Sequence, residues 1–347
     1  MEEIGQRLVR DGYGFDVFVR RHYMNGRQSL KSYKGIRLRY SWGIHSKHLD
    51  AITHSFTAMV KIVLGKYDIV YINTIGLSVL GFIPKLFGKK VIVQVHGLDF
   101  KREKWGWFAR QFLRFSCLTT VWFADRIICV SRQDKEYFDR RFRVNCTLIP
   151  NGVTIRAKIP PNIIKAKWGL ERNSYILFMA RLVKEKGCHL LLEAYRDLDT
   201  DKVLVIAGDD YHREAYSEEL KRQASERIRF VGFVDGREKD ELLSNAYCYV
   251  LPSTLEAMPM SLLEAMSFGN CIIASDLPEL RDVLGEEGLF FRAGSVKDLR
   301  ARLIFALENP AFVAERAHRM MSRVREYHNW DLIYDRYLSV IASLSNL

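Results

Sequence analysis

Two glutamates of this sequence have a type and a spacing that suit a binding or catalytic site. The start of an expected helix lies between them. Glu256 follows an apolar run at 248–251 that predicts a buried strand, and Glu264 lies in a helix that we expect to begin at Pro259. Another apolar run, 271–275, predicts the next strand. Ligands of parallel sheets bind beyond the carboxyl ends of strands, where a helix N-terminus attracts phosphate. The pattern therefore predicts an anion site with two carboxylates, although solvated surface charges often have the same spacing.

A basic segment, ARLVKEKG at 180–187, directly follows another expected strand at 175–179. Arg181 and Lys186 would then reach beyond the carboxyl end of that strand. Their charges would neutralise a departing diphosphate, which is the main requirement when a nucleotide leaves a sugar. The alternative interpretation is a solvated basic loop, which is the commoner origin of an isolated Arg and Lys pair.

Single polar residues mark other strand ends. His96 follows the expected strand at 91–95, where a lone histidine is more often structural than catalytic. Asp209 and Asp210 follow the strand at 203–207 and could suggest a metal. No further ligand cluster accompanies them, so we expect no metal.

These residues must be positioned by alternating strands and helices, which predict two α/β domains with doubly wound parallel sheets. We place the first domain at 1–150, the second at 151–329, and a last amphipathic helix at 330–347; the boundary is the turn signal Pro150-Asn151-Gly152. A doubly wound domain normally opens with a strand, a glycine-bearing turn and a helix. This sequence opens at that helix, so we expect the first domain to lack its first strand.

Composition restricts the class of protein. The chain has 347 residues with 48% hydrophobic and 27% charged residues, which is ordinary for a globular protein. We expect no transmembrane helix and no signal peptide, and the six scattered cysteines favour reduced thiols in a cytoplasmic protein.

Charge is divided unevenly along the chain. Residues 1–150 hold 26 Lys and Arg against 12 Asp and Glu, whereas residues 151–347 hold 27 against 29. A basic first half attracts anions such as nucleic acid, anionic lipid or a polyphosphate substrate. No nucleic-acid-binding motif accompanies the charge, so we expect no specific nucleic acid partner.

The segment PSTLEAMPMSLLEAMSFGNCIIASDLPEL, at 252–280, resembles the donor-binding segment of retaining glycosyltransferases of family 4. The basic segment 180–187 resembles the Gly-Arg-Leu signature of that family, with Ala180 in place of the glycine. The resemblance implies the GT-B fold, in which two Rossmann-like domains face a cleft and the last helix crosses back onto the first domain.

The resemblance also implies a role for each matching residue. Arg181 and Lys186 would hold the donor diphosphate, Glu264 the ribose hydroxyls and Glu256 the donor sugar. His96 would contact the sugar or the transition state, and Asp99 would lie on the acceptor side. Further donor contacts would come from strand ends and from the segment that replaces the usual Gly-Phe-Gly turn of the family: Gly208, Phe233, Val234, Met258, Met260 and Ser261. No cofactor or metal is expected.

The first half narrows the resemblance. Segments 33–37, 47–56 and 97–106 resemble bacterial rhamnosyltransferases of capsule and cell-wall polysaccharide synthesis. This resemblance implies a TDP- or UDP-linked sugar and suggests rhamnose as that sugar. It also implies a lipid-linked or saccharide acceptor, and a peripheral position on an anionic membrane surface at the inner face of the plasma membrane. Five basic residues could meet an acceptor pyrophosphate: His48, His54, Lys101, Arg102 and Lys104.

An alternative function follows from the expected loss of the first strand. A truncated homologue could keep the nucleotide-binding second half and lose the transfer reaction. An in-frame strand with a glycine turn upstream would favour the enzyme over this alternative.

Overall fold

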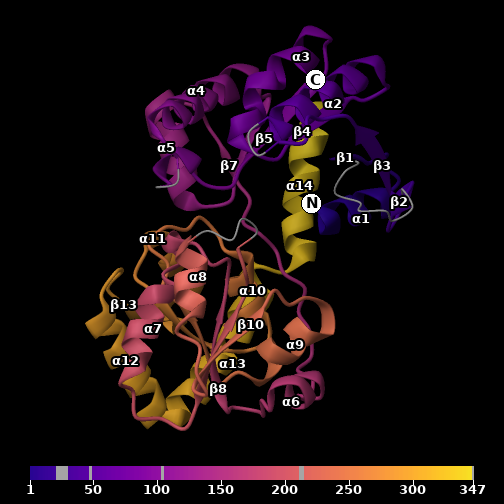
Figure 1. The fold of residues 1–347 in the computed structure, drawn as a ribbon. Helices are drawn as coiled ribbons and strands as arrows, with labels where there is room; N and C mark the ends of the chain where they lie inside the picture. The colour runs from indigo at the N-terminus through magenta and orange to yellow at the C-terminus, as the bar shows by residue number, and fades with distance from the viewer. Residues whose placement is uncertain (21–29, 47–48, 103–104, 211–214, 346–347) are drawn as a thin grey trace. The chain divides into compact units, whose positions relative to one another are not determined.

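The computed structural model describes residues 1–20, 30–46, 49–102, 105–210 and 215–345 (Figure 1). The chain forms two compact units. The first unit comprises Met1–Ile149 together with Trp330–Leu347, and the second comprises Pro150–Asn329. Both are built from parallel strands and helices, so the predicted α/β class is confirmed.

The second unit is built on one sheet of six parallel strands in the order β10-β9-β8-β11-β12-β13. The strand order reverses beside β8, because β9 and β10 extend the sheet on one side while β11 to β13 extend it on the other. Such a reversal opens a crevice at the carboxyl ends of the two diverging strands. The strands are β8 (Tyr175–Met179), β9 (Val203–Ala207), β10 (Ile228–Gly232), β11 (Cys248–Leu251), β12 (Cys271–Ser275) and β13 (Leu289–Phe291).

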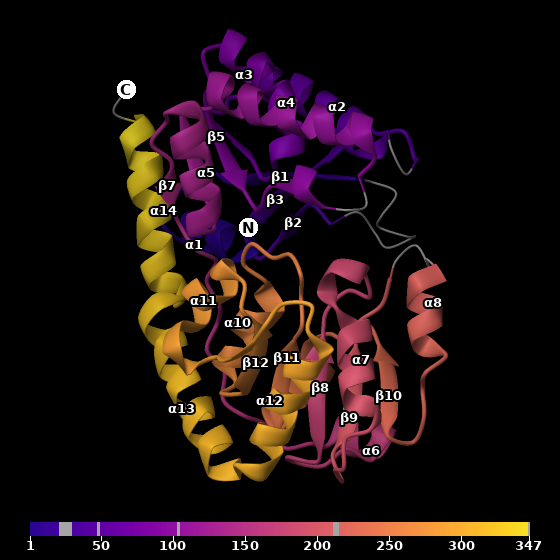
Figure 2. The same ribbon diagram turned by 90° about the vertical axis from the view of Figure 1, so that its left-hand side faces the viewer.

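Helices cover both faces of this sheet (Figure 2). Strands such as β8 and β11 are buried throughout, as expected for a parallel sheet covered on both faces. One face carries α7 (Cys188–Arg196), α8 (Ala215–Lys221) and α12 (Val296–Glu308). The other carries α6 (Ile163–Trp168), α9 (Gly236–Asn245), α10 (Met260–Ser267), α11 (Pro278–Leu284) and α13 (Pro310–Tyr327).

The strands of the first unit form two sheets. One is parallel and contains β4 (Ile69–Ile72), β5 (Lys90–Val95), β6 (Arg126–Cys129) and β7 (Thr147–Leu148) in that order. The other has the order β1-β3-β2, with β1 (Asp16–Arg20) parallel to β3 (Ile36–Ser41) and β2 (Ser32–Tyr33) antiparallel to β3. The described strands of this unit therefore lie in two separate sheets.

β1 and β4 are each an edge strand of their sheet, and no strand in the described part of the chain pairs with both. Side chains bridge the gap: the Tyr67 hydroxyl donates to Asp16 Oδ2 at 2.8 Å, and the Phe18 and Tyr67 rings lie 6.1 Å apart. Beside this bridge is a cavity of about 740 Å³ whose walls include Met1, Phe15 and Ile69. The edges therefore meet through side chains and a cavity, where a continuous sheet would have backbone pairing.

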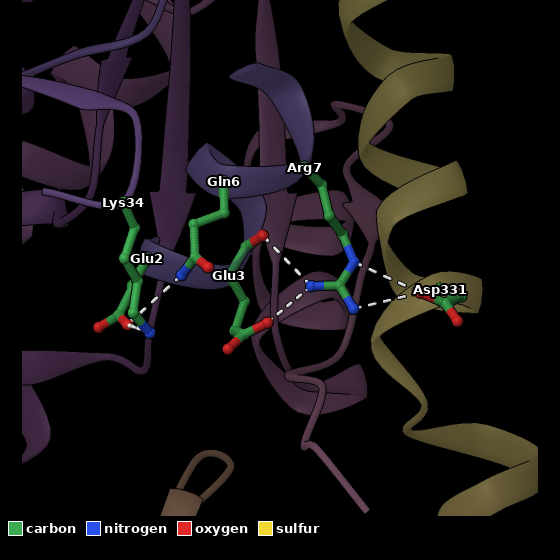
Figure 3. A network of polar contacts seen from close by, with 6 residues as sticks. All are labelled: Glu2, Glu3, Gln6, Arg7, Lys34 and Asp331. Carbon is green, nitrogen blue, oxygen red and sulfur yellow. Dashed lines mark hydrogen bonds and ion pairs between the residues drawn. The ribbon is translucent and has the colours of Figure 1, made fainter. Parts of the chain in front are cut away.

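Helices of the first unit cover its four-stranded sheet on both faces. α1 (Glu2–Arg10) and α14 (Trp330–Ser345) share a core with Ile92 and Ile128 on one face. Figure 3 shows Arg7 of α1 between two carboxylates, at 2.6 Å from Glu3 and 3.1 Å from Asp331 of α14. The other face carries α2 (Asp50–Leu64), η2 (Ile75–Gly81), α3 (Phe82–Leu86), α4 (Trp107–Phe123) and α5 (Arg132–Phe142).

All six cysteines are buried and free. Burial raises the pKa of the Cys188 and Cys271 thiols to about 12, so these side chains are protonated at neutral pH. Within the described residues, no helix is both long enough and apolar enough to cross a lipid bilayer.

Candidate functional site

Loops that follow β8 and β11 meet at the point where the strand order reverses. The Thr254 amide donates to the Glu185 carbonyl at 2.9 Å. Gly187 ends the first loop with φ +69°, and a Cβ there would lie 1.9 Å from the Pro252 carbonyl oxygen. Only glycine fits both the backbone conformation and this close approach. The approach brings the basic segment of one loop against the carboxylate of the other.

Glu256 is bound from two directions in this junction. Lys186 Nζ lies 2.5 Å from Glu256 Oε1, and the Ser253 hydroxyl donates to the same oxygen at 2.7 Å. The carboxyl side chain is 6% exposed and the lysine side chain 15%. The structure therefore brings together two residues, seventy positions apart, that the sequence predicts for one site. A buried carboxylate held in this way has a fixed orientation.

Glu264 lies in the second turn of α10 and is paired across to α9. Lys239 Nζ lies 2.6 Å from Glu264 Oε1, and both side chains are about a quarter exposed. The sequence prediction did not include Lys239. Its helical position gives no signal for this contact, because the pairing depends on α9 and α10 lying side by side on one face of the sheet.

A cavity of about 640 Å³ lies at the carboxyl edge of β8 and β9, next to the start of α10. Gly208 is necessary here: its φ is +126°, and a Cβ would lie 1.9 Å from the Ala180 carbonyl oxygen. Ser261 is fixed in the wall by the Tyr249 hydroxyl at 3.0 Å. The cavity brings together six of the predicted substrate-binding residues, which are Arg181, Gly208, Phe233, Val234, Ser261 and Glu264. It also adds Asp209, Asp210, Asp235 and Lys239, which were not predicted as substrate contacts.

Met258 and Met260 are not among the residues that line this cavity, and their role as donor contacts stays a prediction. Met258 accepts two hydrogen bonds from Asn151: one from the backbone amide to Sδ at 3.0 Å and one from Nδ2 to the carbonyl oxygen at 3.1 Å. Met260 is exposed at the first position of α10. Met258, in the segment that replaces the usual glycine turn, is therefore held in place by hydrogen bonds from Asn151.

Asp209 points one carboxylate oxygen at Lys221, with Nζ at 2.8 Å. In the parts of the chain that the structure describes, no group of three or more His, Cys, Asp or Glu gathers as a metal site. The absence of a metal requirement stays a prediction.

His96 and Asp99 belong to the first unit, at the carboxyl end of β5. His96 Nε2 lies 2.8 Å from Asn73 Oδ1, so the two residues that follow β4 and β5 hold each other. Desolvation lowers the pKa of the His96 imidazole, so the ring is neutral at pH 7. Asp99 pairs with Arg102 at 2.9 Å.

The expected acceptor residues are only partly described. His54 is buried in α2, and Arg102 is engaged by Asp99. Lys101 ends the short helix η3 (Asp99–Lys101). His48 and Lys104 lie outside the described residues. Their proposed contact with a pyrophosphate stays a prediction.

Comparison with protein families matches both halves of the chain. The family described as "Glycosyltransferase Family 4" matches residues 1–156, and the family "Glycosyl transferases group 1" matches residues 162–327. The second match contains both Glu256 and Glu264 as well as the basic segment 180–187.

Curated relatives with similar sequences include two bacterial transferases. The UDP-Gal:alpha-D-GlcNAc-diphosphoundecaprenol alpha-1,3-galactosyltransferase of Escherichia coli is 30% identical over 60% of this chain and 58% of its own length. The D-rhamnosyltransferase WbpZ of Pseudomonas aeruginosa is 30% identical over 44% of this chain and 41% of its own length. The chain spans about half the length of the curated relatives it matches.

Solved structures with a similar fold match nearly the whole chain. The sucrose-phosphate synthase of Thermosynechococcus elongatus has a TM-score of 0.80 at 21% identity, covering 99% of this chain and 92% of that one. Anabaena HepE in complex with UDP-glucose has a TM-score of 0.80 at 18% identity, covering 98% and 94%. At these identities the likeness establishes the fold, and the predicted GT-B fold is confirmed.

Proposed function

We propose that this chain, which has the GT-B fold, is a family 4 glycosyltransferase, and that it is a retaining enzyme that transfers a sugar from a nucleotide-sugar donor to a lipid-linked or saccharide acceptor. The observation that carries the proposal is the cavity at the carboxyl edge of β8, which Arg181, Lys239 and Glu264 line together. Cations and a carboxylate in one cavity match the two polar parts of a nucleotide, a diphosphate and a ribose.

We assign the ribose hydroxyls to Glu264 and the diphosphate to Arg181 and Lys186. A carboxylate accepts hydrogen bonds from two neighbouring hydroxyls, and Lys239 holds Glu264 ready to do so at 2.6 Å. The base would lie against Gly208, Phe233 and Val234, where an exposed aromatic ring offers a stacking surface. Arg181 and Lys186 would neutralise the charge that develops on the leaving diphosphate. We therefore propose that the reaction needs no metal ion.

In the transfer step we propose front-face attack. The bond between the anomeric carbon and the diphosphate oxygen breaks, and the acceptor hydroxyl oxygen forms a bond to that carbon from the same face. The hydroxyl proton passes to the departing diphosphate oxygen. Glu256, held by Lys186 and Ser253, would orient the sugar, and the neutral ring of His96 would contact it.

Two relatives guide the choice of sugar. The Escherichia coli enzyme is named for a UDP-galactose donor and a diphosphoundecaprenol-linked acceptor, and the Pseudomonas aeruginosa enzyme for rhamnose. We propose a TDP- or UDP-linked donor, with rhamnose as the first sugar to test because segments of the first half also resemble rhamnosyltransferases.

Calorimetric titration of the purified chain with TDP, UDP and GDP tests the donor site. We expect one nucleotide to bind, and we expect Glu264→Ala and Arg181→Ala each to weaken its binding about 10- to 100-fold, because each removes a charged hydrogen-bond partner. Arg325→Ala, on α13, serves as the control and should bind normally. A folded protein that binds none of the three would contradict the proposal.

A second candidate function, a nucleotide-binding homologue without transfer activity, is favoured by the gap between β1 and β4 in the first unit. Transfer assays with the nucleotide sugar that binds distinguish the two functions. Product with retained anomeric configuration supports the enzyme. Tight binding of the nucleotide without any product, across lipid-linked and saccharide acceptors, supports the alternative.

A further inference from the structure

The helix α4 exposes aromatic side chains along one face. Phe108, Phe115 and Trp122 recur at seven-residue intervals and so lie on one side of the helix. Phe108 is 82% exposed and Trp122 60% exposed, and Trp107 beside them is also exposed. The rings of Phe115 and Trp122 lie 6.1 Å apart, and those of Trp107 and Phe108 lie 4.8 Å apart. The aromatic side chains therefore form two ring pairs along one side of the helix.

The buried side chains of α4 are Leu113 and Cys117 together with three that carry hydroxyls. Ser116, Thr119 and Thr120 are all buried there. Ser78 of η2 donates to the Ser116 carbonyl at 2.7 Å and lies 2.8 Å from the Thr119 hydroxyl. A surface helix in water normally buries its apolar face and exposes its polar face. α4 departs from this arrangement because it exposes aromatic rings and buries three hydroxyls, which indicates that its outer side is adapted to an apolar environment.

Neighbouring helices continue the exposed apolar surface. Figures 1 and 2 both show α2, α3 and α4 side by side in the first unit. Phe82 of α3 is exposed and its ring lies 6.1 Å from that of Phe123 of α4. Phe56 and Leu64 of α2 are exposed as well. We call this surface the aromatic face, and define it by Phe82, Leu86, Trp107, Phe108, Phe115 and Trp122. Contiguous apolar patches of this kind mark interaction sites.

Charge on the same helices identifies the kind of partner. The three helices carry Lys61, Lys85, Arg110 and Arg114, of which Lys85 is paired with Asp125 at 2.8 Å. Their one carboxylate, Asp50, is buried and paired with Arg20 at 3.3 Å. A second copy of the chain would bring like charges together across this surface. An anionic bilayer offers the complement to both features, because Trp and Phe side chains are favoured at the headgroup level and Lys and Arg are attracted by anionic lipids.

We propose that the aromatic face docks on the headgroup region of an anionic lipid bilayer, with Phe108, Phe115 and Trp122 inserted and the basic side chains beside them. This inference rests on the proposed function, since a docked enzyme would meet a lipid-linked acceptor in the plane where that acceptor is presented. The inference adds to the proposed function the surface and the residues that would hold the chain on the membrane.

Flotation of the full chain with phosphatidylcholine vesicles containing phosphatidylglycerol tests the proposal. We expect the wild-type chain to float with these vesicles. The double variant Phe108→Gln/Trp122→Gln should lose partitioning by about tenfold or more, because it removes two inserted aromatic rings. The control variant Ile304→Gln/Tyr327→Gln changes two exposed apolar residues of the second unit and should float as the wild type does. Both variants change solvent-exposed side chains, and an unchanged melting temperature will show that both are folded.

The proposed membrane docking would be wrong if the wild-type chain did not float, or if the double variant floated as well as the wild type. It would also be wrong if the wild type were a dimer that the double variant converts to a monomer without a change in flotation. Nucleotide titration of the same samples separates this failure from failure of the proposed function. A chain that binds TDP or UDP but does not float overturns only the docking surface. A chain that floats but binds no nucleotide overturns only the donor site.

Discussion

The pair formed by Lys186 and Glu256 is nearly buried, so removing one partner leaves a charge without compensation. We expect Lys186→Ala to lower the free energy of unfolding of the second unit by about 3 kcal/mol, the lower end for a broken buried ion pair. The reason is that Glu256, 6% exposed, would keep its desolvation cost after losing its cation. Urea denaturation followed by circular dichroism would measure the change.

A double variant isolates the electrostatic part of this effect. Lys186→Ala/Glu256→Gln removes the unpaired charge and leaves an amide that Ser253 can still bond. It should therefore be more stable than Lys186→Ala alone, although both lose the lysine. Equal stability of the single and double variants would mean that packing of the lysine stem, and not charge, holds the junction.

We expect substitution of Gly187 to destabilise the protein more than substitution of Gly294, although both residues have a positive φ. Gly187 and Gly294 both have a positive φ, +69° and +79°, but only Gly187 has backbone within reach of a Cβ, the Pro252 carbonyl oxygen at 1.9 Å. Gly294→Ala should cost about 1 kcal/mol for its backbone conformation alone. Gly187→Ala should cost clearly more, because the two loops of the site must separate.

Thermal unfolding and nucleotide titration of the two alanine variants check this expectation. Gly187→Ala should lower both the melting temperature and the affinity, whereas Gly294→Ala should lower only the melting temperature, slightly. Normal affinity in Gly187→Ala would show that the donor site does not need the loops held at this distance.

At the scale of residues, the sequence alone predicts which side chains lie together when their distance from a strand end also determines where they lie in the fold. Glu264 follows Glu256 by the length of one loop and little more than one helical turn, and Arg181 lies two residues after the end of β8, so a parallel fold brings them to one edge of the sheet. Lys239 could not be found in the same way. Its contact with Glu264 spans 25 residues and exists only because α9 and α10 lie side by side.

At the scale of elements, Asp16 connects three segments of the first unit. It binds Arg37 at 2.5 Å and Arg39 at 2.8 Å on β3, and accepts from the Tyr67 hydroxyl before β4. Burial raises the pKa of its carboxyl, but the hydrogen bonds from Arg39, Tyr67 and Arg37 outweigh burial and lower the pKa overall. The stabilisation is thus present above the unfolded-state pKa of about 3.9 and is lost as pH falls through the lower folded-state value.

We therefore expect the first unit to lose stability below about pH 4 in proportion to the protonation of Asp16. Urea midpoints at pH 7, 4 and 3 should fall less for Asp16→Asn than for the wild type, although the variant is less stable at pH 7. Parallel pH curves for the two proteins would show that other carboxylates control the acid transition.

Helix α4 shows that sequence periodicity can predict a helix without predicting which of its sides is buried. The pattern at 105–123 predicts a helix, and α4 is one, but the pattern does not tell which side is buried. Aromatic side chains would be expected inside; instead Ser116 and Thr119 are buried, where Ser78 of η2 donates to the Ser116 backbone carbonyl and lies 2.8 Å from the Thr119 hydroxyl. The sequence at 77–87 likewise predicts a helix, but the structure begins there with the tighter helix η2, and β2 is too short to give an alternating pattern.

At the scale of the whole molecule, the charge difference between the two halves makes membrane docking dependent on salt. Residues 1–150 carry 14 more basic than acidic residues, while residues 151–347 carry two more acidic than basic residues. Each Lys or Arg near an anionic surface contributes about 1 kcal/mol, and the screening length falls from about 10 Å at 0.1 M salt to about 3 Å at 1 M. We expect partitioning into phosphatidylglycerol-containing vesicles to fall about tenfold between 0.1 and 0.5 M NaCl.

Variants separate the electrostatic from the apolar part of this attraction. Arg110→Gln/Arg114→Gln should flatten the salt curve, because it removes two cations of α4 and leaves the aromatic face intact. Phe108→Gln/Trp122→Gln should instead lower partitioning by a similar factor at every salt concentration, because insertion of rings is not screened by ions. Binding that rises with salt, or arginine and aromatic variants with curves of the same shape, would contradict a surface that combines the two forces. Vesicles of phosphatidylcholine alone provide the reference, since their binding should be weak and independent of salt.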